Sequence, residues 1–149
     1  MCRTCFTTQS LYLRIWLVIL VNVACLLSGC ASMGESKEIA ARAVEVFHSQ
    51  LDSERYSEIY AQADEDFKKS SSQEEFEKLA RAVHQKLGTV QAANEIGFLV
   101  NVGSETYVTL TYETIFVNGK ATEQFVWCLS DDRAALYNWS INSTDLITR

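Results

Sequence analysis

The chain has 149 residues, which suits a single domain of ordinary size. It carries 13 basic and 19 acidic side chains, a net charge of −6 near neutral pH. A surface of this sign repels phosphate backbones and anionic lipid headgroups. We therefore expect no nucleic-acid partner and no electrostatic attraction to a membrane.

The N-terminal segment is apolar and almost free of charge. Arg3 and Arg14 are the only charged side chains before Glu35, and residues 15–27 read IWLVILVNVACLL. A membrane-spanning helix needs about 20 apolar residues, so this run is too short to span. Its length fits the apolar region of an export signal. An ordinary cleaved signal and a short uncleaved anchor are the alternatives.

The next residues, Leu27-Ser28-Gly29-Cys30, resemble the lipobox of bacterial lipoprotein signal peptides. The resemblance implies that the Cys30 thiol is acylated, that the chain is cut just before it, and that the new amine also receives an acyl chain such as palmitate. A thiolate is the nucleophile that this chemistry needs, and several acyl chains anchor more stably than one. Because Ala31 follows the cysteine, the resemblance implies the periplasmic side of an outer membrane, where the organism has one.

We therefore expect a signal peptide over residues 1–29, a lipid-anchored tether over 30–35 and one cell-envelope domain over 36–149. Without the two arginines of the signal, 11 basic side chains face 19 acidic ones, a net charge of −8. Only Cys128 of the five cysteines would then keep an unmodified thiol, so no disulfide is expected. No Cys/His cluster has metal-site spacing, and we expect neither a metal nor a cofactor.

Three amphipathic helices are expected at the start of the domain. Apolar residues at helical spacing predict helices over about 36–51, 56–67 and 73–87. The expected buried stripes are Ile39, Ala43, Val46, Phe47 and Leu51 in the first helix, Tyr56, Ile59, Tyr60, Ala63 and Phe67 in the second, and Phe76, Leu79, Ala80, Val83 and Leu87 in the third.

Polar residues and one glycine mark the ends of these helices. Asp52 or Ser53 is the expected N-cap of the second helix. Ser72 and Glu75 have the spacing of a capping box at the start of the third helix. Gly88 is the expected C-cap of the third helix.

The apolar period changes from helical spacing to two after residue 89, which predicts four antiparallel strands. We expect them over about residues 90–102, 107–117, 120–130 and 134–142. The first strand should turn one apolar face to the core, with Gly97 at a bulge. That face comprises Val90, Ala92, Ile96, Phe98, Val100 and Val102.

Turn chemistry predicts the strand register. Asn118-Gly119 is typical of a type I′ hairpin turn, which would place Tyr112 opposite Phe125. A three-residue loop over 131–133 would place Trp127 opposite Tyr137.

Helices followed by an antiparallel meander indicate an α+β fold, with three N-terminal helices packed on a curved four-stranded sheet. This order resembles the nuclear-transport-factor-like, or cystatin-like, cone fold that ketosteroid isomerase shares. More closely, the chain resembles small bacterial lipoproteins of uncharacterised families with that fold. The segments that carry the resemblance are AVEVFHSQLDSERYSEIY, VHQKLG and ALYNWSI, and it covers nearly all of residues 36–145. These are packing and turn motifs, so they imply a fold and no chemistry.

Two functions follow from these patterns. The favoured one is a non-catalytic module that scaffolds, or binds an envelope protein or a small apolar ligand; it predicts that charges on the inner sheet face are absent or lie at the rim. The alternative is a small enzyme with acid–base chemistry in a cavity, which needs a buried carboxylate beside Tyr56 or Tyr60. Glu123 falls on the inner face near the hairpin tip, whereas Glu113 and Glu95 fall outward. We assign no catalytic base.

The remaining polar residues have structural interpretations. We expect His48 to be solvated and His84 to lie at a boundary position, and neither has a metal-ligand partner in the sequence. Residues 63–66 (ADED) would attract a cation weakly without fitting a metal loop. Cys128 is expected to be a small packed thiol on the outer sheet face. That face is apolar enough for a homodimer or partner contact and includes Thr109, Thr111, Ile115, Val117, Val126 and Cys128.

Overall fold

The computed structural model describes residues 33–130 and 133–148. The compact unit of the domain begins at Ser36. A helix occupies residues 33–52, and the elements after it are α2 Tyr56–Gln62, α3 Glu65–Ser70, α4 Gln73–Leu87, β1 Val90–Val102, β2 Thr106–Phe116, β3 Gly119–Ser130, β4 Arg133–Asn142 and α5 Asp145–Thr148. Cys30 and the apolar run before it lie outside the described residues. No helix in the described ranges is long and apolar enough to cross a membrane.

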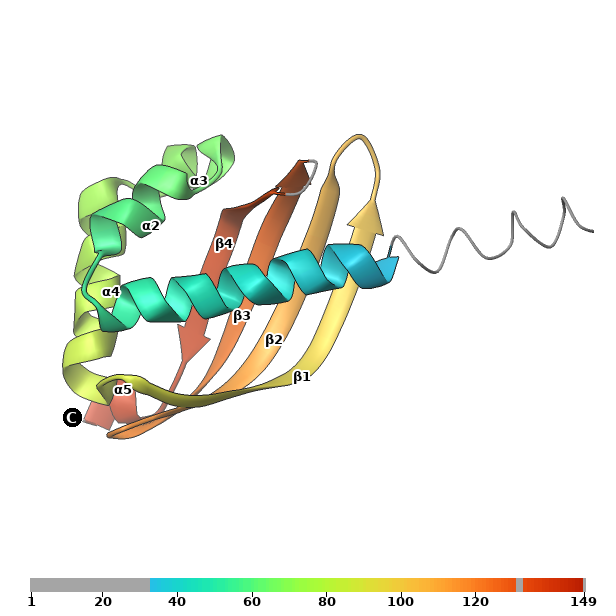
Figure 1. The fold of residues 1–149 in the computed structure, drawn as a ribbon. Coiled ribbons are helices and arrows are strands. Elements are labelled where there is room, and N and C mark those ends of the chain that lie inside the picture. Colours follow the sequence, from blue (N-terminus) through green and yellow to red (C-terminus); the bar gives the residue numbers. More distant parts are fainter. Residues whose placement is uncertain (1–32, 131–132, 149) are drawn as a thin grey trace, which may run out of the picture. The chain divides into compact units, whose positions relative to one another are not determined.

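The four strands form one antiparallel sheet in the order β1-β2-β3-β4. The helix over residues 33–52 crosses one face of this sheet, while α2, α3 and α4 gather on the β4 side (Figure 1). The fold is therefore α+β, with helices before the sheet as predicted. The short helix α5 was not predicted.

The first helix is rotated about its axis relative to the prediction. Val46 was expected to be buried, but 53% of its surface is exposed. Ala40 and Val44 are buried instead, together with Phe47 and Leu51. Two overlapping stripes have helical spacing in this sequence. The stripe that contains alanine at position 40 faces the sheet, which brings the helix backbone close to the strands.

The second helix is broken into α2 and α3. The break comes at Asp64, whose side chain accepts a hydrogen bond from the backbone N–H of Asp66 at 2.8 Å and so caps α3. The prediction that Asp52 or Ser53 caps α2 was wrong, because the N-cap position is Arg55 without a side-chain bond. The Asp52 carboxylate instead accepts the N–H of Val90 at 3.0 Å, which ties the first helix to the start of β1.

The ends of α4 were predicted correctly. Ser72 and Glu75 form both hydrogen bonds of the capping box, and Gly88 caps the C-terminus with φ of 79°. Leu79 was expected to be buried with the apolar stripe of this helix, and this was wrong, because 43% of its surface is exposed.

The β2–β3 hairpin turns one residue earlier than its sequence predicts. Phe116 pairs with Gly119, so Val117 and Asn118 form the turn, and Tyr112 lies opposite Glu123 rather than Phe125. Each strand keeps its predicted faces, because the register moves by two residues and the side-chain period is also two.

Tertiary contacts explain the shifted hairpin turn. The backbone N–H of Val117 donates to the carbonyl of Thr89 at 3.0 Å, and that of Asn118 donates to Leu87 at 2.8 Å. Both carbonyls lie at the end of α4, so the turn is tied to the helix terminus. These two bonds outweigh the local preference of an Asn-Gly pair for a type I′ turn.

The β3–β4 connection was also predicted incorrectly. Ser130 pairs with Arg133, so two residues rather than three separate the paired positions. A register shift between Val126 and Trp127 then brings Phe125 opposite Trp139. The bulge thus buries Trp139, which a two-residue connection alone would have turned outward.

The two-residue separation also changes the partner of Trp127. It pairs with Leu136, and the Tyr137 side chain is displaced to the outer face. There its ring packs edge-on against Tyr107, with ring centroids 4.9 Å apart.

Strand β1 is far more exposed than predicted. Ile96, Phe98 and Val102 are 60%, 54% and 73% exposed, although all three were expected to face the core. Gly97 follows a register shift, so the predicted bulge is confirmed. The strand lies at an edge of the sheet, and the first helix leaves much of its C-terminal half exposed.

Candidate functional site

A buried carboxylate lies between the first helix and the sheet. Glu123 on β3 has no exposed surface. Its Oε1 accepts from Trp139 Nε1 at 3.0 Å, and its Oε2 accepts from Thr114 Oγ1 at 2.6 Å. Nε2 of His48, on the first helix, lies 2.9 Å from the same Oε2. Both carboxylate oxygens therefore have partners, as a buried carboxylate requires.

His48 was expected to be solvated, and this was wrong. It is 7% exposed and lies among aromatic rings, with its centroid 5.6 Å from Phe125 and 6.1 Å from Phe47. The error follows from the rotated helix, because His48 is four residues beyond Val44 and shares its buried face. The sequence signal that would have predicted the burial of His48 is the second apolar stripe of this helix, which runs through Ala40 and Val44.

The expectation that inner-face charges lie only at the rim was also wrong. Glu123 is on the inner face, as predicted, but it is fully buried. Glu95 does not point outward, because its carboxylate lies 2.8 Å from Nζ of Lys37 on the first helix. Glu113 is exposed on the other face, as predicted.

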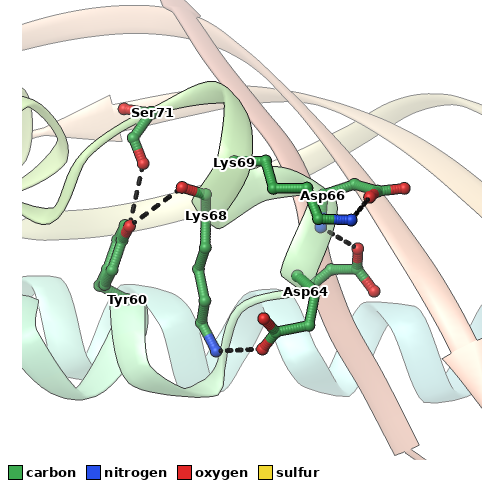
Figure 2. Close-up of polar contacts among 7 residues, drawn as sticks. Tyr60, Asp64, Asp66, Lys68, Lys69 and Ser71 are labelled. Atoms are coloured by element: carbon green, nitrogen blue, oxygen red, sulfur yellow. Dashed lines mark hydrogen bonds and ion pairs between the residues drawn. The ribbon is translucent and has the colours of Figure 1, made fainter.

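The two tyrosines considered as hydrogen-bond donors in a cavity have different surroundings. Tyr60 has its hydroxyl 3.0 Å from the carbonyl of Ser71 and 3.4 Å from that of Lys68, so it binds the backbone at the end of α3 (Figure 2). Tyr56 is 2% exposed and its hydroxyl has no partner among the described residues. Burial raises the pKa of Tyr56 above its usual range. Neither tyrosine contacts Glu123.

The other singled-out residues have structural roles. His84 is partly buried, as expected, and its Nδ1 lies 3.9 Å from a Glu54 oxygen. In the ADED segment, Asp66 pairs with Lys69 at 2.8 Å (Figure 2). No group of three or more potential metal ligands gathers within residues 33–130 and 133–148. Cys128 is a buried thiol, as predicted, and burial raises its pKa.

A pocket of about 190 Å³ lies between the helices and the sheet near Trp127. The first helix, α2, β3 and β4 all contribute to it. Its lining is mainly apolar and has no acidic or basic side chain: Ala43, Val46, Phe47, Gln50, Ile59, Gln62, Trp127, Ala134 and Leu136. Val46 and Gln62 are exposed, so the pocket has a mouth on the surface.

The polar groups of this pocket are few. Gln50 is 6% exposed, and its amide nitrogen is 3.4 Å from the Gln62 amide oxygen. Trp127 is 5% exposed, and its indole N–H has no hydrogen-bond partner in the part of the chain described. A buried donor without an acceptor costs about 1–3 kcal/mol, so it is the unusual feature of this site.

One aromatic layer separates the pocket from the buried carboxylate. Phe47 lines the pocket, and its ring centroid lies 5.1 Å from Phe125 and 5.0 Å from Trp139. Glu123 and His48 do not line the pocket. The structure thus brings together a mainly apolar pocket, a wall residue whose indole N–H has no partner among the described residues, and behind them a closed hydrogen-bond network.

The fold and this site define the chain as a small α+β domain with a pocket between its helices and its sheet. The model of a family described as proteins of unknown function, DUF4019, matches residues 43–137. The chain therefore belongs to that family. The matched segment contains every residue that lines the pocket. No curated protein matches the chain.

Proposed function

We propose that this protein is a lipid-anchored cell-envelope protein whose domain binds a small, uncharged, mainly apolar molecule without transforming it. The observation that carries the proposal is a mainly apolar pocket with Trp127 in its wall, whose buried indole N–H has no hydrogen-bond partner among the described residues. A bound molecule with a carbonyl, ether or hydroxyl oxygen would accept this hydrogen bond and remove the cost of the buried donor.

The lining of the pocket limits the ligand. Without an acidic or basic side chain, the pocket has no counter-ion for a carboxylate, a phosphate or an amine. The amides of Gln50 and Gln62 can donate and accept near the mouth. A dry cavity of about 150 Å³ holds one benzene molecule, so a volume of about 190 Å³ suits a single ring or a short chain.

Two observations support binding rather than acid–base chemistry. Both oxygens of Glu123 are already hydrogen-bonded, and the residue has no exposed surface. A general base must lie within hydrogen-bond reach of the substrate, and Glu123 is outside the lining of the pocket. We infer that the network of Glu123 positions the first helix on the sheet.

The anchor is the second part of the proposal. It rests on the lipobox-like residues before Cys30 and on the short apolar run that precedes them. Expression of Cys30→Ser should give a longer chain without covalent lipid, because the serine hydroxyl is not alkylated as a thiolate is. Mass spectrometry of the N-terminal peptide makes the comparison. Acylation and normal processing of the variant would contradict the anchor.

The pocket is tested with two molecules of similar shape. Cyclohexanone has an acceptor oxygen and cyclohexane has none. NMR of the ¹⁵N-labelled protein should show the Trp127 indole signal moving on addition of cyclohexanone. The Trp139 indole, which already donates to Glu123, should stay in place.

A matched variant identifies the hydrogen bond. The wild-type protein should prefer cyclohexanone to cyclohexane by about fivefold, the value of one net hydrogen bond. Trp127→Phe should lower the affinity for cyclohexanone relative to cyclohexane by at least this factor, because it keeps an aromatic wall but leaves the carbonyl oxygen without a donor. An unmoved Trp127 signal, or the same preference in Trp127→Phe, would refute the role of this donor.

A further inference from the structure

An exposed apolar surface follows the C-terminal half of β1. We define the β1 apolar edge as Ile96, Phe98, Leu99 and Val102, each at least 54% exposed. Phe98 pairs with Leu110, a fully buried residue, so Phe98 lies on the helix-facing side of the sheet. Phe98 and Val102 therefore continue the apolar inner face at this edge, whereas Leu99, which pairs with Thr109, lies on the other face.

The backbone of this edge is also open. β1 pairs only with β2 within the described sheet and stands at the end of the strand order. Natural proteins usually protect such an edge with lysine, proline or a very short strand. β1 has 13 residues, with neither lysine nor proline among them. A long, apolar and open edge of this kind indicates a surface that is covered in use.

The chain itself indicates what covers the edge. Lys37 lies with Nζ 4.7 Å from the ring centroid of Phe98 and 2.8 Å from Glu95, so the start of the domain adjoins this edge. Lys37 is seven residues after Cys30, and seven residues span at most about 25 Å. An acylated Cys30 would therefore hold the edge close to the bilayer surface.

Charge also favours a lipid surface at this position. The whole chain has a net charge of −6, which would oppose contact with anionic headgroups. Glu95, the only charged residue of β1, is paired with Lys37. The β1 apolar edge itself thus adds no unpaired charge, and the nearest exposed carboxylate, Glu105 in the turn after β1, accepts a hydrogen bond from the Tyr107 hydroxyl.

We propose that the β1 apolar edge lies against the bilayer that holds the Cys30 anchor, with Phe98 and Val102 among the lipid headgroups. This rests on the acylation of Cys30 proposed above. The contact would hold the domain in one orientation on the membrane. A second copy of the chain is the other occupant that an open strand edge would accept, and the experiment distinguishes the two.

The test uses the full acylated protein in phosphatidylcholine vesicles. A nitroxide label is attached at Val102→Cys, with Cys128→Ala as background, and Leu79→Cys on α4 is the matched control because Leu79 is also exposed. At position 102 we expect access of a water-soluble paramagnetic reagent to be several-fold lower than at position 79. Access of oxygen, which concentrates in lipid, should be higher.

Three results would overturn the inference, and each is distinct. Equal access at positions 102 and 79, with an acylated Cys30 peptide in the same sample, would refute the bilayer contact and leave the anchor intact. A Cys30 peptide without acyl chains would refute both proposals. Spin–spin broadening at position 102 that disappears on dilution with unlabelled protein would show that a second copy covers the edge.

Discussion

The buried carboxylate of Glu123 is the feature whose removal tests the packing of this fold most directly. We consider Glu123→Leu, which places an apolar side chain of similar size at a fully buried position. The change removes the acceptor of Trp139 and Thr114 and the partner of His48. Each of these three groups comes from a different element, so the effect reports on how the first helix is held on the sheet.

The magnitude follows from what the partners can do afterwards. The Thr114 hydroxyl can rotate, and His48 keeps 7% of its surface exposed, but the indole N–H of Trp139 loses the only partner found for it among the described residues. A stranded buried donor costs about 1–3 kcal/mol, and each of the two other lost hydrogen bonds costs about 1 kcal/mol. We expect the free energy of unfolding to fall by about 3–5 kcal/mol.

Urea unfolding followed by circular dichroism measures this loss. In thermal unfolding, at about 4 °C per kcal/mol, Tm should fall by about 12–20 °C. Glu113→Gln is the matched control, because Glu113 is an exposed glutamate on the neighbouring strand, and it should change stability by less than about 0.5 kcal/mol.

A double mutant separates stranding from simple loss of packing. In the double mutant Glu123→Leu, Trp139→Phe no indole N–H is left without an acceptor. Its loss of stability should therefore be about 1 kcal/mol smaller than the sum of the losses in the two single mutants. A loss below about 1 kcal/mol for Glu123→Leu, or strict additivity in the double mutant, would refute the reasoning.

Three further predictions concern the backbone, a phenol and a thiol. Gly88→Ala should lower the free energy of unfolding in urea by about 1–3 kcal/mol, because φ is 79° and the new Cβ would lie 3.1 Å from Cβ of Val117. Gly97→Ala is the near-neutral control, because the space around Gly97 is open. Burial and nearby carboxylates raise the pKa of Tyr112 to about 12, so its contribution to stability is complete below pH 10 and is lost as pH rises through about 12. Tyr112→Phe should therefore remove this part of the loss of stability at alkaline pH. An unchanged dependence of stability on pH would contradict the prediction. Because burial raises the pKa of Cys128, its thiol should react with an aromatic disulfide reagent many times more slowly in the folded protein than in urea, and equal rates would show that it is accessible.

Local chemistry allowed the element order and several boundaries to be predicted. The capping box of Ser72 and Glu75 and the terminal Gly88 depend on residues within one or two turns of each other, so they can be read without the rest of the molecule. The alternation of side chains in β2 and β3 placed Glu123 and Trp127 on the inner face for the same reason.

The positions of His48 and Trp139 were decided by tertiary structure. Two stripes compete in the first helix, and only packing against the sheet selects the one that buries His48 beside Glu123. The hairpin turn moved because backbone groups at the end of α4 bind it, and the bulge in β3–β4 restored a face that the loop alone would have reversed. The pocket depends on all of these choices, since its walls come from four elements far apart in the sequence. A sequence pattern states which face of an element is apolar, but the free energy of packing against a partner determines which of two similar faces is used.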